Sequence, residues 1–248
     1  MLSISFLNKN KIKTIRFATF SAVRSVLAVY PVAGRFKFRY NGLFLTIFIF
    51  FAGFAFASPA YGATQIFRSV GPGATGLLTS DTAHARTITL TSGVATFSVA
   101  LPDNIGVGDA VIIDTGGTDQ TIDASDTLLF IHSRTSSTSY TLRTHTGSVP
   151  GDIAINDTYQ IYRAYTSLAN AEAGTKNTSI PIAFNGGNRD LVTNDEQWNI
   201  ACYANGTTAD TTAVDIFGWT TDIDNFIKIY TPTLLTEVGV SQRHSGKP

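Results

Sequence analysis

Four aspartates in one loop are the side chains whose types and spacing could most directly do chemistry. They are Asp114, Asp119, Asp123 and Asp126. Calcium prefers several convergent carboxylate and carbonyl oxygens, so this loop is the one candidate metal site. The EF-hand pattern is not met, since Gly116 and Thr118 stand at its third and fifth positions. Aspartates that hydrogen-bond within solvated turns explain the same cluster, so we expect no resident cofactor and keep calcium to be tested.

Three other motifs lack the context that their chemistry requires. Residues 71–76 match G-x-G-x-x-G, but a dinucleotide site needs a helix to begin there, and the β-rich residues that follow predict a loop. No two histidines share metal-ligand spacing among His84, His132, His145 and His244. Cys202 is the only cysteine and shares an apolar pattern with Trp198 and Ile200, which favours a small buried hydrophobe over a nucleophile.

Hydrolase and lyase motifs are missing from the sequence. It contains neither G-x-S-x-G nor H-E-x-x-H. A polysaccharide lyase needs a base beside the uronate and a cation or arginine to neutralise the substrate carboxylate. Asp222, Asp224 and Arg243 could be placed in such a set, but turn chemistry explains both aspartates. We therefore assign no catalytic residue and expect a protein that is not an enzyme.

Aromatic side chains near the C-terminus are candidates for stacking on sugar rings. If Val214 and Ile216 lie on the face of a strand that points to the core, Phe217 and Trp219 lie on its exposed face. Tyr203 is the third candidate, and packing in a core would use the same three residues. The partner that this chemistry implies is an extracellular polysaccharide or the cell envelope.

Charge is divided unevenly along the chain. Residues 1–62 hold eight bases and no acid, which leaves ten bases and 18 acids, a net charge of −8, for the remainder. A basic segment ahead of an apolar one orients a chain with its N-terminus in the cytoplasm. The acidic remainder argues against a nucleic-acid partner, because phosphate binding needs a basic surface.

Residues 1–62 are typical of an export leader. The apolar run 43–57 has 15 residues, fewer than the roughly 20 of a membrane-spanning helix, and Pro59 and small residues follow it. We expect cleavage after Gly62 or Ala63 and an extracellular or cell-surface protein. If the leader is retained, it is the part that contacts a membrane. The leader is long, so either it is an extended type or translation starts downstream of Met1.

Short strands separated by turns follow the leader. They recur about every ten residues with no amphipathic helix between them, which predicts a small antiparallel barrel or sandwich over residues 63–165. Ser92 and Gly93 are the expected hairpin turn. The expected strands are 65–70, 87–90, 94–100, 110–113, 128–132, 140–143 and 161–165.

Residues 166–248 differ in pattern. Ser167–Gly174 is the one convincing helix, with Ser167 as N-cap and Gly174 as its end. The expected strands after it are 198–204, 213–219 and 226–230. The whole chain beyond the leader is therefore predicted to be all-β.

This second part resembles a known family in the runs YTSLANAEAG, WNIACYA, DTTAVDIFGWTT, FIKIYTP and QRHSG. They are similar to the opening segment of exported bacterial right-handed parallel β-helix proteins, the pectate-lyase-like solenoids of the microbial cell surface. The segment VALPDNIGVGD…LLFIHSRTSSTSYTL resembles a small β domain ahead of such helices. The resemblance implies a helix cap at 166–174 followed by the first rungs. A solenoid needs several rungs, so we expect a truncated chain.

The function implied is that of an exported cell-surface or secreted, non-catalytic β module with an adhesive, structural or glycan-contacting role. The alternative is the N-terminal fragment of a β-helix polysaccharide lyase or glycoside hydrolase whose active rungs are missing.

Overall fold

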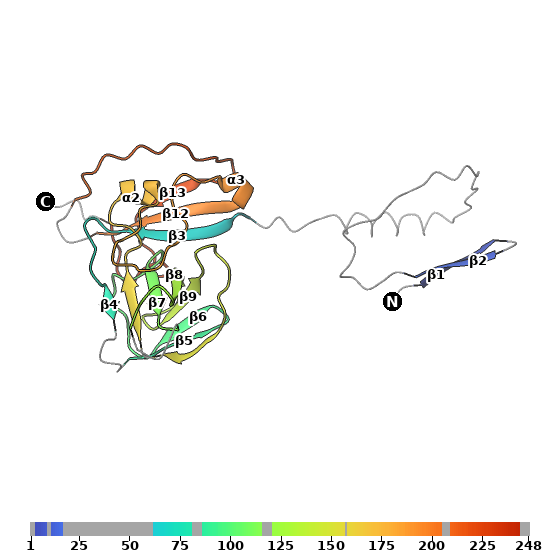
Figure 1. The fold of residues 1–248 in the computed structure, drawn as a ribbon, viewed down its shortest axis with the longest axis horizontal. Helices are drawn as coiled ribbons and strands as arrows, with labels where there is room; N and C mark the ends of the chain where they lie inside the picture. Colours follow the sequence, from blue (N-terminus) through green and yellow to red (C-terminus); the bar gives the residue numbers. More distant parts are fainter. Residues whose placement is uncertain are drawn as a thin grey trace. The chain divides into compact units, whose positions relative to one another are not determined.

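The computed structural model describes residues 3–8, 11–16, 62–80, 86–115, 121–156, 158–204 and 209–243. The chain divides into two compact units, Met1–Ala60 and Tyr61–Pro248. In the first unit, β1 (Ser3–Asn8) and β2 (Lys11–Arg16) pair as an antiparallel hairpin (Figure 1). The apolar run 43–57 and the expected export signal around it lie outside the described residues. Within the described part, no helix is long and apolar enough to cross a membrane.

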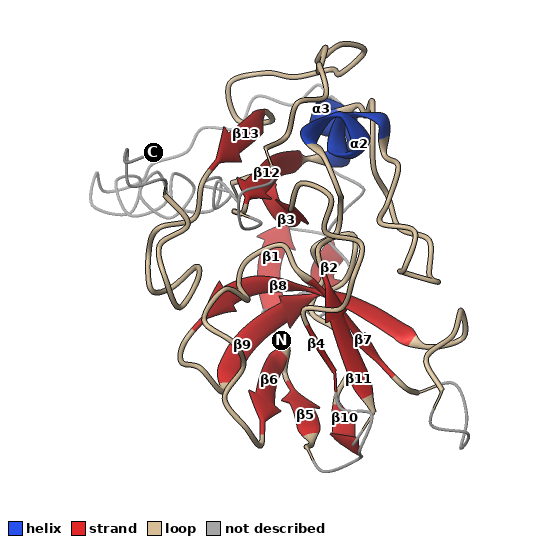
Figure 2. Cartoon of the chain, turned by 90° about the vertical axis from the view of Figure 1, so that its left-hand side faces the viewer, coloured by secondary structure: helices blue, strands red, loops and turns tan. Residues whose placement is uncertain are grey.

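The second unit contains an eight-stranded antiparallel sheet, with strand order β10-β5-β6-β9-β8-β7-β11-β4. Only residues 157 and 158 separate β10 from β11, although these strands pair near opposite ends of the sheet, so the sheet must curl (Figure 2). The strands are β4 (Thr79–Ser80), β5 (Ile88–Thr91), β6 (Val94–Phe97), β7 (Ala110–Ile113), β8 (Thr127–Arg134), β9 (Ser139–Arg143), β10 (Ile153–Asn156) and β11 (Tyr159–Tyr162).

The turn between β5 and β6 is the expected one. Ser92 and Gly93 both have positive φ, 51° and 77°, as a two-residue type I′ hairpin requires. The Ser92 N–H also donates to Asp152 Oδ1 at 2.6 Å.

Two hydrophobic cores lie on the two faces of the curled sheet. In β7, Val111 and Ile113 face the interior of the curl, while Ala110 and Ile112 belong to a second core shared with the rest of the unit. Burial on both faces explains why β7 reads as the continuous apolar run AVII.

A separate three-stranded sheet holds the remaining strands in the order β13-β12-β3. Its strands are β3 (Thr64–Val70), β12 (Glu196–Cys202) and β13 (Ile227–Tyr230), all parallel (Figure 1). The placement of β3 corrects the sequence prediction, which puts this strand in the antiparallel part. Period-2 alternation predicts a strand but does not identify its partner, and here the partner comes more than a hundred residues later.

Two short helices complete the unit. The expected helix is confirmed as α2 (Leu168–Ala173), with Ser167 Oγ accepting from the Asn170 N–H and Gly174 left-handed at φ 71°. A second helix, α3 (Leu191–Asn194), is capped by Asp190 and is not predicted by the sequence pattern. The strand expected over 213–219 is wrong, because these residues form a largely exposed loop. The all-β class is thus confirmed, and the described parallel strands form one sheet of three.

Candidate functional site

The outer edge of β3 is covered by neighbouring backbone. The Ser69 N–H donates to Gly108 O at 3.0 Å, and the Tyr165 N–H donates to Ser69 O at 3.0 Å. Gly108 has a φ of 85° and packs directly against the backbone of Arg68. The backbone hydrogen-bonding groups of Ser69, near the C-terminal end of this edge, are therefore used within the unit.

The opposite edge of the parallel sheet is open. Among the described residues no strand pairs with the far side of β13, and Ile229 on this strand is 39% exposed. A small apolar groove, with room for about one water molecule, lies between α2 and this edge, and Glu172 is the one charged residue in its lining. The lining residues are Leu168, Glu172, Ile200, Ile216, Trp219, Ile227 and Ile229. The apolar interior between α2 and the sheet thus reaches solvent at β13.

Glu172 of α2 fixes the loop that borders this groove. Its Oε1 accepts from Trp219 Nε1 at 3.3 Å and from the Phe217 N–H at 3.4 Å. With its amide nitrogen toward Glu172, Asn188 donates to Glu172 Oε1 at 2.7 Å and to Phe217 O at 2.6 Å. Gly218 takes a positive φ of 73° between the two aromatic residues. One carboxylate therefore positions both aromatic candidates.

The three sugar-stacking candidates lie in different environments. Phe217 is 62% exposed, whereas Trp219 is half-buried with its ring edge-to-face on Trp198 at 5.2 Å. Tyr203 is 3% exposed and donates its hydroxyl to Val107 O at 2.8 Å. Its ring packs with Val238 in a small core, which leaves no ring face for a sugar. The structure therefore leaves Phe217, beside Trp219, as the accessible aromatic surface.

The candidate calcium aspartates close turns. Asp126 accepts from the Thr115 N–H at 3.0 Å and the Asp123 N–H at 2.7 Å, one on each oxygen. Asp123 accepts from Ser125 Oγ and the Ser125 N–H, and these bonds lower the pKa of its carboxyl. Asp114 is buried, and Asp119 lies outside the described residues. Within the described ranges no three metal-ligating side chains converge, and calcium binding stays a prediction.

The other sequence candidates are apart from one another. Cys202 is half-buried beside the second core, and burial raises the pKa of its thiol to about 11. His132 packs its ring edge-to-face on Phe67 at 4.9 Å. Asp222 Oδ1 accepts from the Asp224 and Asn225 N–H groups at 3.0 and 2.8 Å, which is turn chemistry. His84 and His244 lie outside the described residues.

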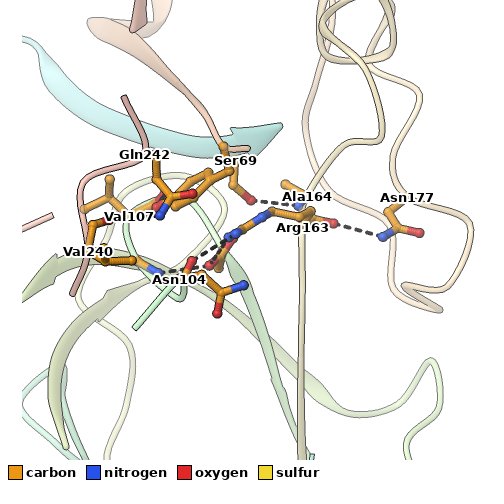
Figure 3. Close-up of polar contacts among 11 residues, drawn as sticks. Ser69, Asn104, Val107, Arg163, Ala164, Asn177, Val240 and Gln242 are labelled. Carbon is orange, nitrogen blue, oxygen red and sulfur yellow. Dashed lines mark hydrogen bonds and ion pairs between the residues drawn. The ribbon is translucent and has the colours of Figure 1, made fainter. Parts of the chain in front are cut away.

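A buried ion pair that sequence reasoning missed lies at the ends of β7 and β11 of the curled sheet, and Figure 3 shows its Arg163 beside Asn104. Arg163 Nη1 lies 2.6 Å from both oxygens of Asp109, and its Nη2 donates to Asn104 O at 2.9 Å. The Arg163 guanidinium also lies 3.6 Å from the centre of the Tyr203 ring. The available signal was the position of Arg163 between Ile161 and Tyr165, on the apolar parity of its strand.

Comparisons with known proteins identify no relative of this chain. A scan against protein-family models finds no match, and searches of curated proteins and of solved structures find none either. The open edge of β13, the groove beside it and the loop that carries Phe217 are the surface features that can indicate a function.

Proposed function

We propose that this chain is an exported, non-catalytic β module that begins a right-handed parallel β-helix and contacts glycans through the surface around Phe217. The observation that carries this proposal is the asymmetry of the parallel sheet. Its β3 edge is covered by backbone around Ser69, and its β13 edge is open beside an apolar groove. A sheet built in this way can extend in one direction, as the first rungs of a solenoid do.

The stacking of side chains across the three strands supports a solenoid. The register aligns Ile66 of β3 with Trp198 of β12 and Trp198 with Ile227 of β13, and all three pack in one cluster. Apolar ladders of this kind form the interior of repeat proteins whose rungs contact only their neighbours. A further rung would pair with the open side of β13, and its inward-facing residues would align with Ile227 and Ile229.

The connection between β12 and β13 also supports it. Parallel strands in globular domains are usually joined through a helix. Among the described residues of 203–226, no helix lies between these two strands. A helix-free return to the neighbouring parallel position is the path of a solenoid coil, and such crossovers are almost always right-handed. Ala171 of α2 belongs to the same core as Val70 and Ile200, so this helix shares a core with the parallel sheet.

Export is proposed from the sequence pattern of residues 1–62. The net charge of −8 beyond residue 62 and the single cysteine agree with a secreted protein that relies on packing rather than disulfides. N-terminal sequencing of the protein from the culture medium or cell surface tests this part. Recovery from the cytosol with residues 1–62 attached would contradict export.

A glycan-binding assay with matched variants tests the contact surface. The purified chain is applied to an array of acidic and neutral glycans, with and without calcium, alongside Phe217→Ala and Leu235→Ala. Leu235 is 70% exposed and provides an apolar control outside the loop. We expect retention that Phe217→Ala weakens by about tenfold, as for a lost aromatic stacking contact, and that Leu235→Ala leaves unchanged.

Two results would overturn the proposal. Equal retention of the wild-type chain and Phe217→Ala would remove this loop from the contact surface. Release of shortened or unsaturated glycan products would show an enzyme, and the calcium arm would then report whether that activity needs calcium.

A further inference from the structure

A second buried charge cluster lies between the parallel sheet and the segments that cover it. We name Arg68, His145, Tyr165, Arg189 and Glu196 the Arg68 cluster. The Arg68 guanidinium lies 3.6 Å from the centre of the Phe130 ring, 5.4 Å from Phe184 and 5.9 Å from Trp198. Arg189 lies 5.1 Å from the same Trp198 ring, and Tyr165 packs on the same Phe184 at 5.6 Å. Shared aromatic rings therefore link both guanidinium groups and the phenol into one cluster.

The Arg68 cluster carries an excess positive charge. Arg189 forms an ion pair with Glu196 at 2.8 Å, whereas the hydrogen bonds of Arg68 within the described part go to the carbonyls of Phe67 and His145. Burial lowers the pKa of Arg68 to about 10, so its guanidinium is still protonated at neutral pH. Burial and the guanidinium of Arg68 lower the pKa of His145, which keeps its ring neutral. Two cations and one anion remain.

An unpaired charge in a protein interior is strongly destabilising, so something must compensate Arg68. The ring faces and the two carbonyls supply part of that compensation. They leave Arg68 Nε buried without a hydrogen-bond partner among the described residues. Arg68 itself is 1% exposed, so bulk solvent does not reach this group.

Three more polar atoms of the Arg68 cluster are in the same situation as Arg68 Nε. Tyr165 Oη, Arg189 Nη1 and His145 Nδ1 are buried and have no partner within the described part of the chain. Buried donors are nearly always satisfied, so the three donors among these atoms, Arg68 Nε, Arg189 Nη1 and the Tyr165 hydroxyl, point to a shared acceptor. Gly186 packs closely against the Tyr165 hydroxyl, since a Cβ there would lie 2.5 Å from it, so a larger residue would displace this donor.

We propose that the Arg68 cluster binds one small monovalent anion of the halide class, held by Arg68 Nε–H and the Tyr165 hydroxyl. One negative charge offsets the surplus cation, whereas a doubly charged oxyanion would leave the interior negative. A halide accepts several hydrogen bonds without fixed directions, which suits donors that come from separate segments of the chain. This inference does not depend on the proposed function, and its failure would leave that proposal unchanged.

Anion exchange at constant ionic strength tests the site. The full chain is transferred to sodium gluconate, whose anion is too large for the cluster, and gluconate is then replaced stepwise by chloride or bromide. We expect the thermal unfolding midpoint to rise and then saturate, because the ligand binds the folded state. Tyr165→Phe should weaken the apparent anion affinity by about tenfold, the effect of losing one hydrogen bond to a charged group. Lys228→Met removes an exposed charge and should keep the full response.

A direct measurement on the wild-type chain tests the site even if the variants fail to fold. Crystals of the wild-type chain grown in sodium bromide should show an anomalous peak within hydrogen-bond distance of Arg68 Nε and Tyr165 Oη. The proposal is overturned if this peak is absent, or if chloride and gluconate give equal midpoints. It is also overturned if Tyr165→Phe responds to chloride like the wild-type chain, which would mean that water satisfies these donors.

Discussion

Arg163 Nη1 lies 2.6 Å from both carboxylate oxygens of Asp109, and neither side chain is more than 2% exposed. Arg163 directly follows β11, Asp109 directly precedes β7, and the Tyr203 ring that stacks on Arg163 directly follows β12. The ion pair therefore joins the ends of β11 and β7 within the curled sheet, and the Tyr203 ring on Arg163 connects it to the end of the parallel sheet. Its effect on stability depends on both partners, because each is buried in the presence of the other.

Removing one partner of this pair should be costly. Asp109→Ala leaves the Arg163 charge buried and should lower the free energy of unfolding by about 3–5 kcal/mol. Chemical denaturation measures the change. The double variant Asp109→Leu/Arg163→Met should be less destabilised than Asp109→Ala, because it leaves no unpaired charge. Asp224→Ala is the exposed control, and a cost for Asp109→Ala as small as for this control would contradict the role of the pair.

Substitutions at two adjacent residues of the β5–β6 turn should change the free energy of unfolding in opposite directions. Gly93→Ala places a Cβ at a φ of 77° and close to Val149, and should lower the free energy of unfolding by about 1–2 kcal/mol. Ser92→Asn should raise it by a few tenths of a kcal/mol, since asparagine tolerates the left-handed conformation that Ser92 already adopts. Thermal and urea unfolding of both variants check the pair. A stabilising Gly93→Ala would show that the turn is not type I′.

Acidification should destabilise the fold through His132. Burial, followed by the charge of Arg143, lowers the pKa of this imidazole below its usual 6.5. Below pH 6.5 the unfolded chain then binds a proton that the folded chain does not, so the free energy of unfolding falls as the pH falls through the lowered pKa. The unfolding free energy measured between pH 8 and pH 5 should decline less in His132→Gln than in the wild-type chain. Parallel curves would exclude His132 as the source.

Cys202 should react slowly with thiol reagents. Burial raises the pKa of its thiol from 9.0 to about 11, which leaves about a hundredfold less thiolate at pH 8 than at an ordinary cysteine. We expect labelling by a maleimide or an aromatic disulfide to be slower by at least this factor in the folded chain than in urea. Rapid labelling of the folded chain would mean that the second core opens at β12.

Local chemistry is the part of this fold that the sequence predicts well. The caps at Ser167 and Gly174 and the turn at Ser92 and Gly93 are confirmed, because the required conformation follows from the residues themselves. The partner of β3 and the strand expected over 213–219 were wrong, because pairing depends on which edge is free after folding. The alternation of apolar and polar residues within one segment could not have revealed either error.

The burial of polar and aromatic side chains around the candidate site was harder to predict from the sequence. Parity along β12 correctly groups Trp198, Ile200 and Cys202, and it puts Tyr203 on the outward face. The segment around Val238 covers that face, which no pattern near Tyr203 indicates. Arg68 and Arg163 are buried for the same kind of reason, since their neighbours come from distant parts of the chain.

The distance along the chain between β3 and β12 has a consequence for how the molecule is made. Gln65 and Gln197 bond side chain to side chain across 132 residues, so β3 is synthesised long before its neighbour exists. Until then the apolar side chains of the segment QIFRSV have no core in which to pack and can associate with other chains. A charge within such a segment disfavours aggregation, and Arg68 lies in the middle of this one. We therefore expect the residue that complicates the finished interior to protect the nascent polypeptide.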